Sequence, residues 1–454
     1  MFTPTLQRQP ISWGFKAPLV PPAEVGRVLP LPRRSRSRRV TIFSQFFPPD
    51  FAATGQLLDD LTARLADRGL SLRVLTGQPA YAFREGSGAR KQFETNRFIR
   101  RTRVSRLWPK RIRGRAVNGM IFCLWASLRM LRYALQGDLL LFTTEPAYLP
   151  VVGWLIHKLT GSPYLVLLYD IYPDVLVELK VLPERHWLVR LWRHLQRQAV
   201  RDAQEVIVLS EPMARRVERH CPEVRGRLAV LPSWADPSAI RPIPRAENHF
   251  VQEHQLTGTF NVLYSGNQGR CHDLVTLMAA ALLLRKQSGI RFLFVGAGAQ
   301  NERLQLLARE WGLSNCTFLP YQDQDTLPHS LTSADVAVVS LGIEAEGLVA
   351  PSKLYGHLAA GTPIAAIAPQ GAELGQLVER HGCGRWFANG DAEALAAWIV
   401  NLRDEPALAQ RYGAAARQLL LAEAHPDAIA ERYLKLMNRH LPLAEQRRPL
   451  AACC

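Results

Sequence analysis

The apolar residues of this chain alternate between short continuous runs and stretches with a helical repeat. The first run, RVTIFSQF from Arg39, is rich in β-branched and aromatic side chains, which is typical of a buried strand. The segment LLDDLTARLADRG then places four leucines between 57 and 65 on one face and ends at Gly69, as a helix should. The next run, SLRVLTG, predicts another strand. This strand–helix–strand order is the unit of a parallel sheet.

The same alternation continues along the chain and begins again after a proline-rich break. Before the break it predicts strands at 138–144, 164–170 and 205–210, with helices between them. The break itself, LAVLPSWADPSAIRPIPR, has no apolar period and is interpreted as a linker. After the break it predicts strands that begin near 260, 290 and 335, and helices at 273–286, 300–311, 325–333 and 352–360. The sequence therefore predicts an α/β protein with two doubly wound, Rossmann-like domains facing each other across a cleft.

These patterns divide the chain into five segments. They are a basic, proline-rich extension that we expect to be disordered (1–38), an N-terminal α/β domain (39–232), a linker (233–250), a C-terminal α/β domain (251–425), and a C-terminal helix and tail (426–454). We expect the last segment to pack back on the N-terminal domain.

The formal net charge of +17 is concentrated in two segments. Residues 1–39 carry +7 and residues 84–115 carry +10, so the rest of the chain is neutral in sum. A localised basic excess indicates an anionic partner, either nucleic acid or an anionic membrane surface. A solvated basic face without any partner is the alternative reading.

Cysteine spacing and hydropathy add three expectations. The seven cysteines show neither a CxxC motif nor the spacing of a Cys/His metal site, so we expect a reducing compartment and no structural metal. The apolar stretch 117–135 is interrupted by Arg129 and Arg132, so a membrane-spanning helix is not expected, although an interfacial contact remains open.

Open parallel sheets bind ligands beyond the carboxyl ends of their strands, and two glycine-containing loops occupy such positions. Gly266 and Asn267 follow one predicted strand and lead to Arg270, a positive charge beside a helix start. Gly296 and Gly298 follow the next strand. Glycine lets a backbone approach a phosphate closely, but a purely structural turn explains either loop as well.

A third loop, EAEGLVAPSKLYGHLAAGTP from Glu344, is more informative. Ser352 and Lys353 stand at the start of its helix, where a lysine opposes the helix dipole unless a bound anion removes the conflict. Glu346 or Glu344 could accept hydrogen bonds from sugar hydroxyls, and a simple surface helix cap is the alternative. Tyr321, in a fourth loop, lies where exposed backbone could bind a base.

The order YSGNQGR, FVGAG, FLPY, SADVAVVSL and EGLVAPSKLYGHLAAGTP resembles the family 4 retaining glycosyltransferases of the GT-B fold. FFPPDFAATGQ and YDIYPDVLVELKVL extend the resemblance into the first half, so that it spans about residues 40–438. The chain looks most like the bacterial branch that builds cell-surface polysaccharides on lipid carriers.

This resemblance implies a nucleotide-sugar donor in the C-terminal domain and an acceptor in the N-terminal domain. Arg270 and Lys353 would neutralise the donor diphosphate without a metal, and Glu346 (or Glu344) would lie near the donor sugar. Asp170 would contact the acceptor, unless it only caps the next turn. The donor, UDP- or GDP-linked, is a substrate, and no cofactor is implied. The remaining donor-binding positions would be Gly266, Asn267, Gly296, Gly298, Tyr321, Ser352 and Tyr355.

The chain departs from the family pattern at several of these positions. The second glutamate of the family falls on Gly356, and its first acidic place falls on Leu348 by the same count. Tyr169 replaces the histidine that often precedes the acceptor-loop aspartate, and His272-Asp273 replaces a frequent Lys-Gly pair. These changes bear on the identity of the nucleotide and the sugar.

The predicted function is transfer of a sugar, with retention, from a nucleotide donor to a lipid-linked or polysaccharide acceptor in cell-surface glycan biosynthesis. The enzyme would be cytoplasmic and peripherally bound to the inner face of the plasma membrane, through 84–135. One alternative is a UDP-sugar 2-epimerase-like enzyme on the same architecture. Another is a basic nucleic-acid-binding protein, although aromatic residues are sparse in the basic segments and no recognition motif appears, so no nucleic-acid partner is expected.

Overall fold

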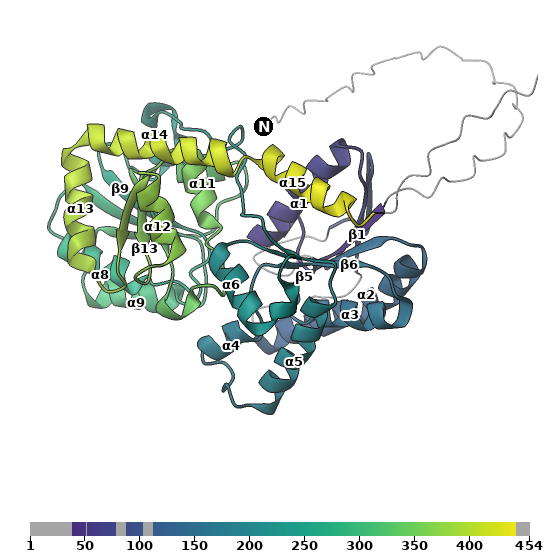
Figure 1. The fold of residues 1–454 in the computed structure, drawn as a ribbon. Helices are drawn as coiled ribbons and strands as arrows, with labels where there is room; N and C mark the ends of the chain where they lie inside the picture. The colour runs from purple at the N-terminus through teal and green to yellow at the C-terminus, as the bar shows by residue number, and fades with distance from the viewer. Residues whose placement is uncertain (1–38, 51, 79–87, 103–111, 442–454) are drawn as a thin grey trace, which may run out of the picture. The chain divides into compact units, whose positions relative to one another are not determined.

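The computed structural model describes residues 39–441, apart from residue 51 and the segments 79–87 and 103–111 (Figure 1). The predicted disordered extension 1–38 and the tail from 442 lie outside the described residues. Both of the sheets described below belong to one unit of the chain, Arg38–Cys454.

The first sheet is built around β1, which pairs in parallel with β2 on one side and β5 on the other. Its strand order is β3-β4-β2-β1-β5-β6-β7-β8, and β3 alone among these strands pairs antiparallel. Strands β5 and β6 are buried at every position because helices cover both faces, which explains their continuous apolar runs. The strands are β1 (Arg39–Phe43), β2 (Ser71–Thr76), β3 (Lys91–Glu94), β4 (Arg97–Arg101), β5 (Leu139–Thr143), β6 (Tyr164–Leu168), β7 (Glu205–Val208) and β8 (Leu228–Val230).

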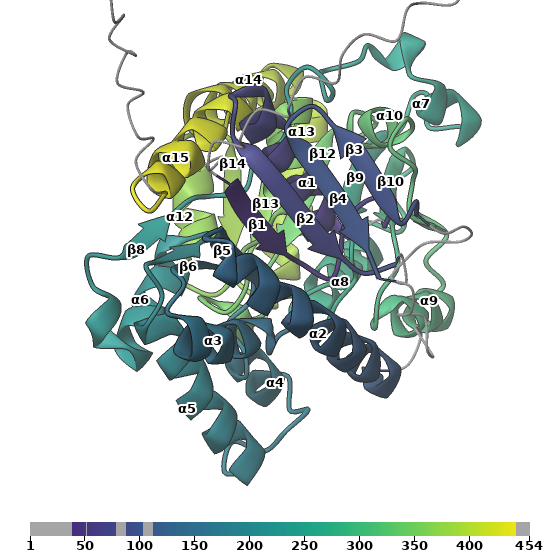
Figure 2. The same ribbon diagram turned by 90° about the vertical axis from the view of Figure 1, so that its right-hand side faces the viewer.

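Six α-helices and one short 3₁₀ helix accompany this sheet in the described residues. Helix α3 packs between α2 and α5, so that the three helices lie side by side (Figure 2). The helices are α1 (Ala53–Asp67), α2 (Ile112–Leu135), α3 (Leu149–Thr160), α4 (Asp174–Glu178), α5 (Trp187–Arg201), α6 (Glu211–His220) and η1 (Pro222–Val224).

The second sheet is entirely parallel, with the order β11-β10-β9-β12-β13-β14. The direction of winding reverses between β9 and β12, and ligands of such sheets bind outside the carboxyl ends of the strands at this reversal. The strands are β9 (Phe260–Ser265), β10 (Ile290–Val295), β11 (Cys316–Leu319), β12 (Val336–Ser340), β13 (Ile364–Ile367) and β14 (Gly384–Phe387). The helices are η2 (Arg245–Glu247), α7 (His249–Glu253), α8 (Val275–Leu283), α9 (Asn301–Glu310), α10 (Leu327–Leu331), η3 (Ile343–Ala345), α11 (Lys353–Ala360), α12 (Glu373–Arg380), α13 (Ala392–Asp404) and α14 (Pro406–Glu423).

The last helix returns to the first sheet. Helix α15 (Pro426–Asn438) packs on α1 and places Tyr433 and Met437 in the core of the first domain. Its first turn is tied to α1 by an ion pair of 2.9 Å between Arg64 and Asp427.

Part of the basic segment 84–115 is internal. Arg97 and Arg101 are 9% and 5% exposed, although they belong to the segment whose charge suggested an anionic partner. Arg97 pairs with Asp59 at 2.6 Å, and Arg101 donates hydrogen bonds to the carbonyl oxygens of Ala89 and Pro48. These two cations stabilise the edge of the sheet, so they are not available to a surface ligand.

Candidate active site

The loops after β9 and β10 pack against each other with almost no space between their backbones. A Cβ atom on Gly296 (φ 126°) would lie 2.2 Å from the Gly266 carbonyl oxygen, and one on Gly298 would lie 2.5 Å from the Gln268 carbonyl oxygen. Since no side chain fits there, loop packing by itself explains Gly296 and Gly298. This is the structural alternative that the sequence left open for them.

Gly266 has a different neighbour, the side chain of Lys353. A Cβ atom on Gly266 (φ 122°) would lie 2.7 Å from Lys353 Cε. The lysine therefore lies directly over this glycine, at the carboxyl end of β9. Its Nζ also lies 5.5 Å from the centre of the Tyr264 ring. The loop after β9 and the first residue of α11, far apart in sequence, meet at the reversal point of the sheet.

Lys353 is held by a histidine that the sequence identified only as a departure from the family pattern. Lys353 Nζ lies 3.0 Å from His272 Nε2, and His272 Nδ1 lies 2.8 Å from the Ser340 carbonyl oxygen. Because a carbonyl only accepts, the imidazole carries its proton on Nδ1 and accepts from the lysine through Nε2. Burial and the neighbouring ammonium lower the pKa of His272 to about 3, so it stays neutral. Burial lowers the pKa of Lys353 to about 8.

Arg270 lines a pocket between the two domains. The pocket has about 430 Å³ of free space, part of it open to solvent, and its walls come from the loop after β9, from η3 and from α4. Arg270 and Glu344 are exposed there, while Cys271 and Leu348 are partly or fully covered. Asn267 is also exposed, on the same loop as Arg270.

Asp170 comes to this place from the first domain. It forms an isolated bridge with Val349, and the adjacent Ile171 amide donates to the Leu348 carbonyl at 3.0 Å. Burial raises the pKa of the Asp170 carboxyl to about 6. The charges of Asp170 and Lys353 both act on the pKa of the Cys271 thiol, so Cys271 is close to both sides of the site.

A second carboxylate, Glu145, accompanies Asp170 and was missed by the sequence analysis. Both of its oxygens accept from the Thr54 hydroxyl at 2.7 Å. Burial raises the pKa of Glu145 to about 8, with the charge of Asp170 acting in the same direction. Glu145 directly follows the predicted strand 138–144, as Asp170 ends the next one, so the same argument would have selected it.

Glu346 is engaged with a helix. Its Oε1 accepts a hydrogen bond of 3.2 Å from the amide of Glu373, the first residue of α12. Such a carboxylate stabilises a helix N-terminus, and burial raises its pKa. Of the two candidate carboxylates in this loop, Glu344 lines the pocket with Arg270 and Glu346 caps α12. Leu348 is 1% exposed and belongs to the core of the first domain.

The remaining candidates are Tyr321, in the loop after β11, and Ser352 and Tyr355, at the start and in the first turn of α11. Tyr321 donates to the Ala297 carbonyl at 3.2 Å, and Ser352 makes no side-chain cap to α11 within the described residues. Burial raises the pKa of Tyr355, and the carboxylates that act on it are Glu373 and Glu423. The Tyr355 side chain therefore faces α12 and α14.

Gly356 lies where α11 packs on α10. A Cβ atom on Gly356 would lie 3.2 Å from Leu331 Cδ1, so a glutamate at this position would press on that leucine. One turn before Gly361, His357 is fully buried, and neither ring nitrogen has a hydrogen-bond partner among the described residues. Burial and the charge of Lys353 lower its pKa to about 4. Among the residues that the structure describes, no cluster of His, Cys, Asp or Glu is suited to hold a metal ion.

Each of the two domains matches a known family. Residues 53–234 match the family described as Glycosyl transferase 4-like domain, and residues 247–419 match Glycosyl transferases group 1. The chain is 28% identical over 276 residues to the protein named glycosyltransferase WbjE of Pseudomonas aeruginosa, covering 60% of this chain and 68% of that protein. It is 24% identical over 361 residues to the protein named colanic acid biosynthesis glycosyl transferase WcaI of Escherichia coli (strain K12), covering 75% and 86%.

The fold is also that of a solved structure, HepE from Anabaena in complex with UDP-glucose. The TM-score is 0.63 at 15% identity, and the match covers 88% of this chain and 99% of that one. Together, the two matched families account for both domains, and the chain is a glycosyltransferase of the GT-B type.

Proposed function

We propose that the enzyme transfers a sugar from a UDP- or GDP-sugar to a lipid-linked or polysaccharide acceptor, with retention of anomeric configuration and without a metal. The observation that carries this proposal is the position of Lys353. It lies over Gly266 at the reversal point of the second sheet, and both Lys353 and the Asp170 carboxylate of the first domain are near Cys271. UDP-glucose in HepE and the colanic acid name of WcaI support the donor and acceptor classes.

The donor diphosphate would lie against Lys353, with Arg270 closing over it from the exposed loop. Burial disfavours the charged form of Lys353, and the negative charge of a bound diphosphate would stabilise that form. The two cations would then stabilise the charge that develops on the leaving phosphate as the sugar bond breaks. Asn267 and Ser352 would position the phosphate oxygens, and Glu344 would be the carboxylate nearest the sugar.

The acceptor would approach from the side of Asp170 and Glu145. Asp170 ionises near pH 6, so at neutral pH its carboxylate accepts a hydrogen bond from the attacking hydroxyl. Glu145 remains mostly protonated at the same pH and can donate. At neutral pH Asp170 is thus ionised and can act as a base, whereas Glu145 is mostly protonated and can act as an acid.

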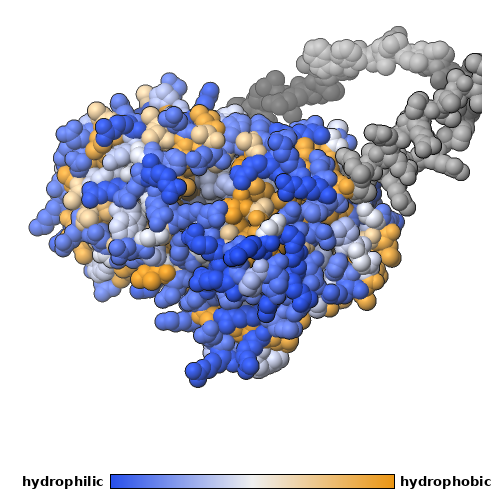
Figure 3. All heavy atoms as spheres, in the orientation of Figure 1, coloured by the Kyte–Doolittle hydropathy of each residue, from blue (hydrophilic) through white to orange (hydrophobic). Residues whose placement is uncertain are grey.

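Peripheral binding to the inner face of the plasma membrane, in the cytoplasm, belongs to the same proposal. Helix α2 exposes one apolar stripe at helical spacing: Met120, Leu124, Leu128, Leu131 and Leu135. Figure 3 shows apolar residues at the right-hand edge, over α2. The sequences of α2, α3 and α5 contain basic residues and no acidic one, which suits an anionic bilayer surface. Within the described part of the chain, no helix is long and apolar enough to span a membrane.

A transfer assay tests the proposal. Purified protein and a membrane extract are incubated with labelled UDP-, GDP- and dTDP-sugars, and label is followed into the lipid and polysaccharide fractions. We expect incorporation from one donor, its loss in Lys353→Ala, and no loss in Lys286→Ala, an exposed lysine after α8. Conversion of the donor into another nucleotide sugar without labelled product would instead favour the epimerase. No turnover and no nucleotide binding would refute the proposal.

A further inference from the structure

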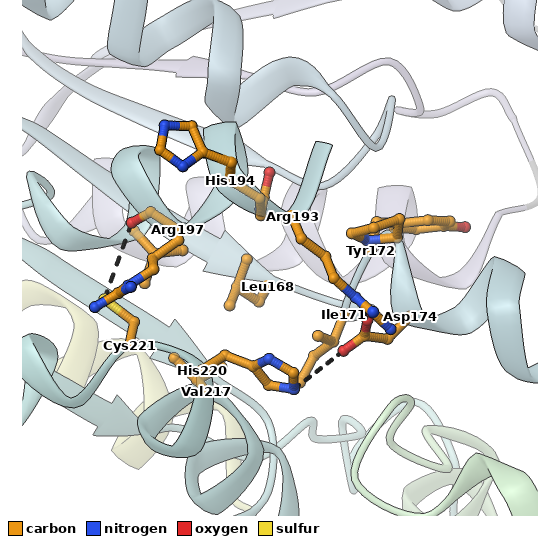
Figure 4. A pocket seen from close by; sticks show the side chains of 13 residues that line it. Leu168, Ile171, Tyr172, Asp174, Arg193, His194, Arg197, Val217, His220 and Cys221 are labelled. Carbon is orange, nitrogen blue, oxygen red and sulfur yellow. Dashed lines mark hydrogen bonds and ion pairs between the residues drawn. The ribbon is translucent and has the colours of Figure 1, made fainter. Parts of the chain in front are cut away.

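A larger pocket lies in the first domain, behind the loop that carries Asp170 (Figure 4). It has about 810 Å³ of free space, part of it open to solvent, between the end of β6, α5 and the end of α6. Its floor is apolar and includes Leu168, Ile171, Val200 and Val217. None of the residues that we assigned to the donor or to catalysis lines it.

The polar part of the pocket contains two guanidinium groups. Arg193 and Arg197 line it together with His194, His220 and Asp174, and outside the lining Arg193 pairs with Glu184 at 3.2 Å and Arg197 with Glu223 at 2.6 Å. Asp174 accepts from Arg193 Nε at 2.7 Å and lies 3.3 Å from His220 Nε2, a contact that Figure 4 marks with a dashed line. Two guanidinium groups beside an apolar floor match a molecule with an apolar chain and an anionic head.

The buried amide of Gln196 is a second sign that this pocket takes a ligand. Gln196 is 8% exposed and lines the pocket, yet its Oε1 has no hydrogen-bond partner among the described residues. Leaving a buried acceptor unpaired is unfavourable, so a donor group supplied by a bound molecule would stabilise it. A sugar hydroxyl is such a donor.

The pocket lies between the exposed apolar residues of α5 and the loop that carries Asp170. Ile171 and Tyr172 line it, while the preceding residue, Asp170, bridges to Val349 on the side of Lys353. The Tyr172 ring stacks on Trp192 of α5 at 6.1 Å. In the same first turns of α5, Trp187 and Leu191 are 65% and 46% exposed, and α5 packs on α3. One short loop therefore separates the pocket from the acceptor carboxylates.

We propose that this α4–α5–α6 pocket binds the lipid-phosphate end of the acceptor, an inference that rests on the proposed transfer to a lipid-linked acceptor. The apolar chain lies on the floor of the pocket, and the phosphates lie at Arg193 and Arg197. The attached sugar then reaches Gln196 and the Asp170 loop. The pocket thus selects the acceptor by its carrier and delivers the sugar to the site.

Binding of farnesyl diphosphate to the full chain, measured by calorimetry, tests this assignment. His220→Trp fills the pocket from its half-exposed rim, and we expect it to weaken farnesyl diphosphate binding by about tenfold or more. His381→Trp is the matched control, since His381 is also a surface histidine beside a carboxylate, Glu423 at 3.5 Å. Arg197→Gln, an exposed position, should weaken binding without threatening the fold. UDP binding should be unchanged in all three variants.

Two results would overturn the assignment: equal binding of farnesyl diphosphate by the two tryptophan variants, or equal binding of dihexanoyl phosphatidylglycerol and farnesyl diphosphate by the unmodified chain. The latter would indicate a site for bulk membrane lipid. Failure of the proposed function gives a different result: nucleotide binding and sugar transfer are then absent, whether or not farnesyl diphosphate binds.

Discussion

The two sides of the candidate active site carry ionisable groups of opposite sign, and burial disfavours the charged form of each. On one side, which we call the lysine wall, Lys353 is held by the neutral His272, and its pKa falls to about 8. On the other, the carboxylate wall, the pKa values of Asp170 and Glu145 rise to about 6 and 8. Each wall disfavours its own charge because water is displaced.

The difference between the walls lies in their partners. The hydrogen-bond partner of the lysine-wall ammonium is a neutral imidazole, and no ion pair with a carboxylate accompanies it in the described part of the chain, so a donor diphosphate would supply the counter-charge. The carboxylate wall gives Glu145 a hydroxyl partner, Thr54, and the charge of Asp170 opposes the ionisation of Glu145. We infer that the first wall is prepared for an anion and the second for hydroxyl groups. The following predictions test this contrast.

Removal of the ammonium should have the largest effect. Lys353→Ala should reduce kcat by roughly 10²–10³-fold, the cost of deleting one preorganised group that stabilises a developing negative charge. Donor affinity should fall as well, measured by UDP calorimetry. Lys286→Ala serves as the control. A Lys353→Ala enzyme with full activity would remove the lysine wall from the mechanism.

Neutralisation of Asp170 in the carboxylate wall should slow sugar transfer to the acceptor without changing donor binding. Asp170→Asn should lower kcat by about 10²-fold, in the range for a lost acid–base group, with UDP affinity unchanged. The unmodified enzyme should lose activity as the pH falls through about 6, because protonated Asp170 no longer accepts from the acceptor hydroxyl. A pH–rate profile of both proteins checks this. Persistence of the same acidic limb in Asp170→Asn would assign it to another group.

His272 is a positioning residue, so its loss should be milder. His272→Phe removes the hydrogen bond to Lys353 Nζ, and we expect the donor KM to rise about tenfold, about 1.4 kcal/mol, with a smaller change in kcat. His272→Gln should recover much of the loss, since its amide oxygen can accept from the lysine. Equal KM values for the phenylalanine and glutamine variants would indicate that the histidine only fills space.

The smallest effect concerns stability. The pKa of Glu145 is raised in the folded protein, so the folded state holds its proton more tightly, and this costs stability as the pH rises from about 5 towards 8. Glu145→Gln removes that cost and should raise Tm at pH 8 by about 2–4 °C, as expected for about 1 kcal/mol. At pH 5 the two proteins should melt together. A variant that is less stable at pH 8 would show that the carboxylate itself is favourable there.

The sequence predicted the fold class well, because the fold class depends on local patterns. Alternating apolar runs predicted both parallel sheets, and the carboxyl-end rule led to Gly266, Lys353 and Asp170. The same rule would have found Glu145 had it been applied to every strand. The hairpin β3–β4 was not predicted, because its charged residues showed no apolar alternation.

What the sequence determined by itself was the order of elements and the chemical types at the strand ends, since propensity and periodicity act over a few residues. Tertiary structure alone decided the roles of particular side chains. His272 and Lys353 are 81 residues apart in the sequence, where His272 is seen only as a departure from the family pattern. The distance of 3.0 Å between His272 Nε2 and Lys353 Nζ identifies the histidine as the hydrogen-bond partner of the lysine. Contacts between distant segments also assign Glu346 to the start of α12 and Arg97 to the interior. No local pattern contains this information, because it arises where separately formed elements pack together.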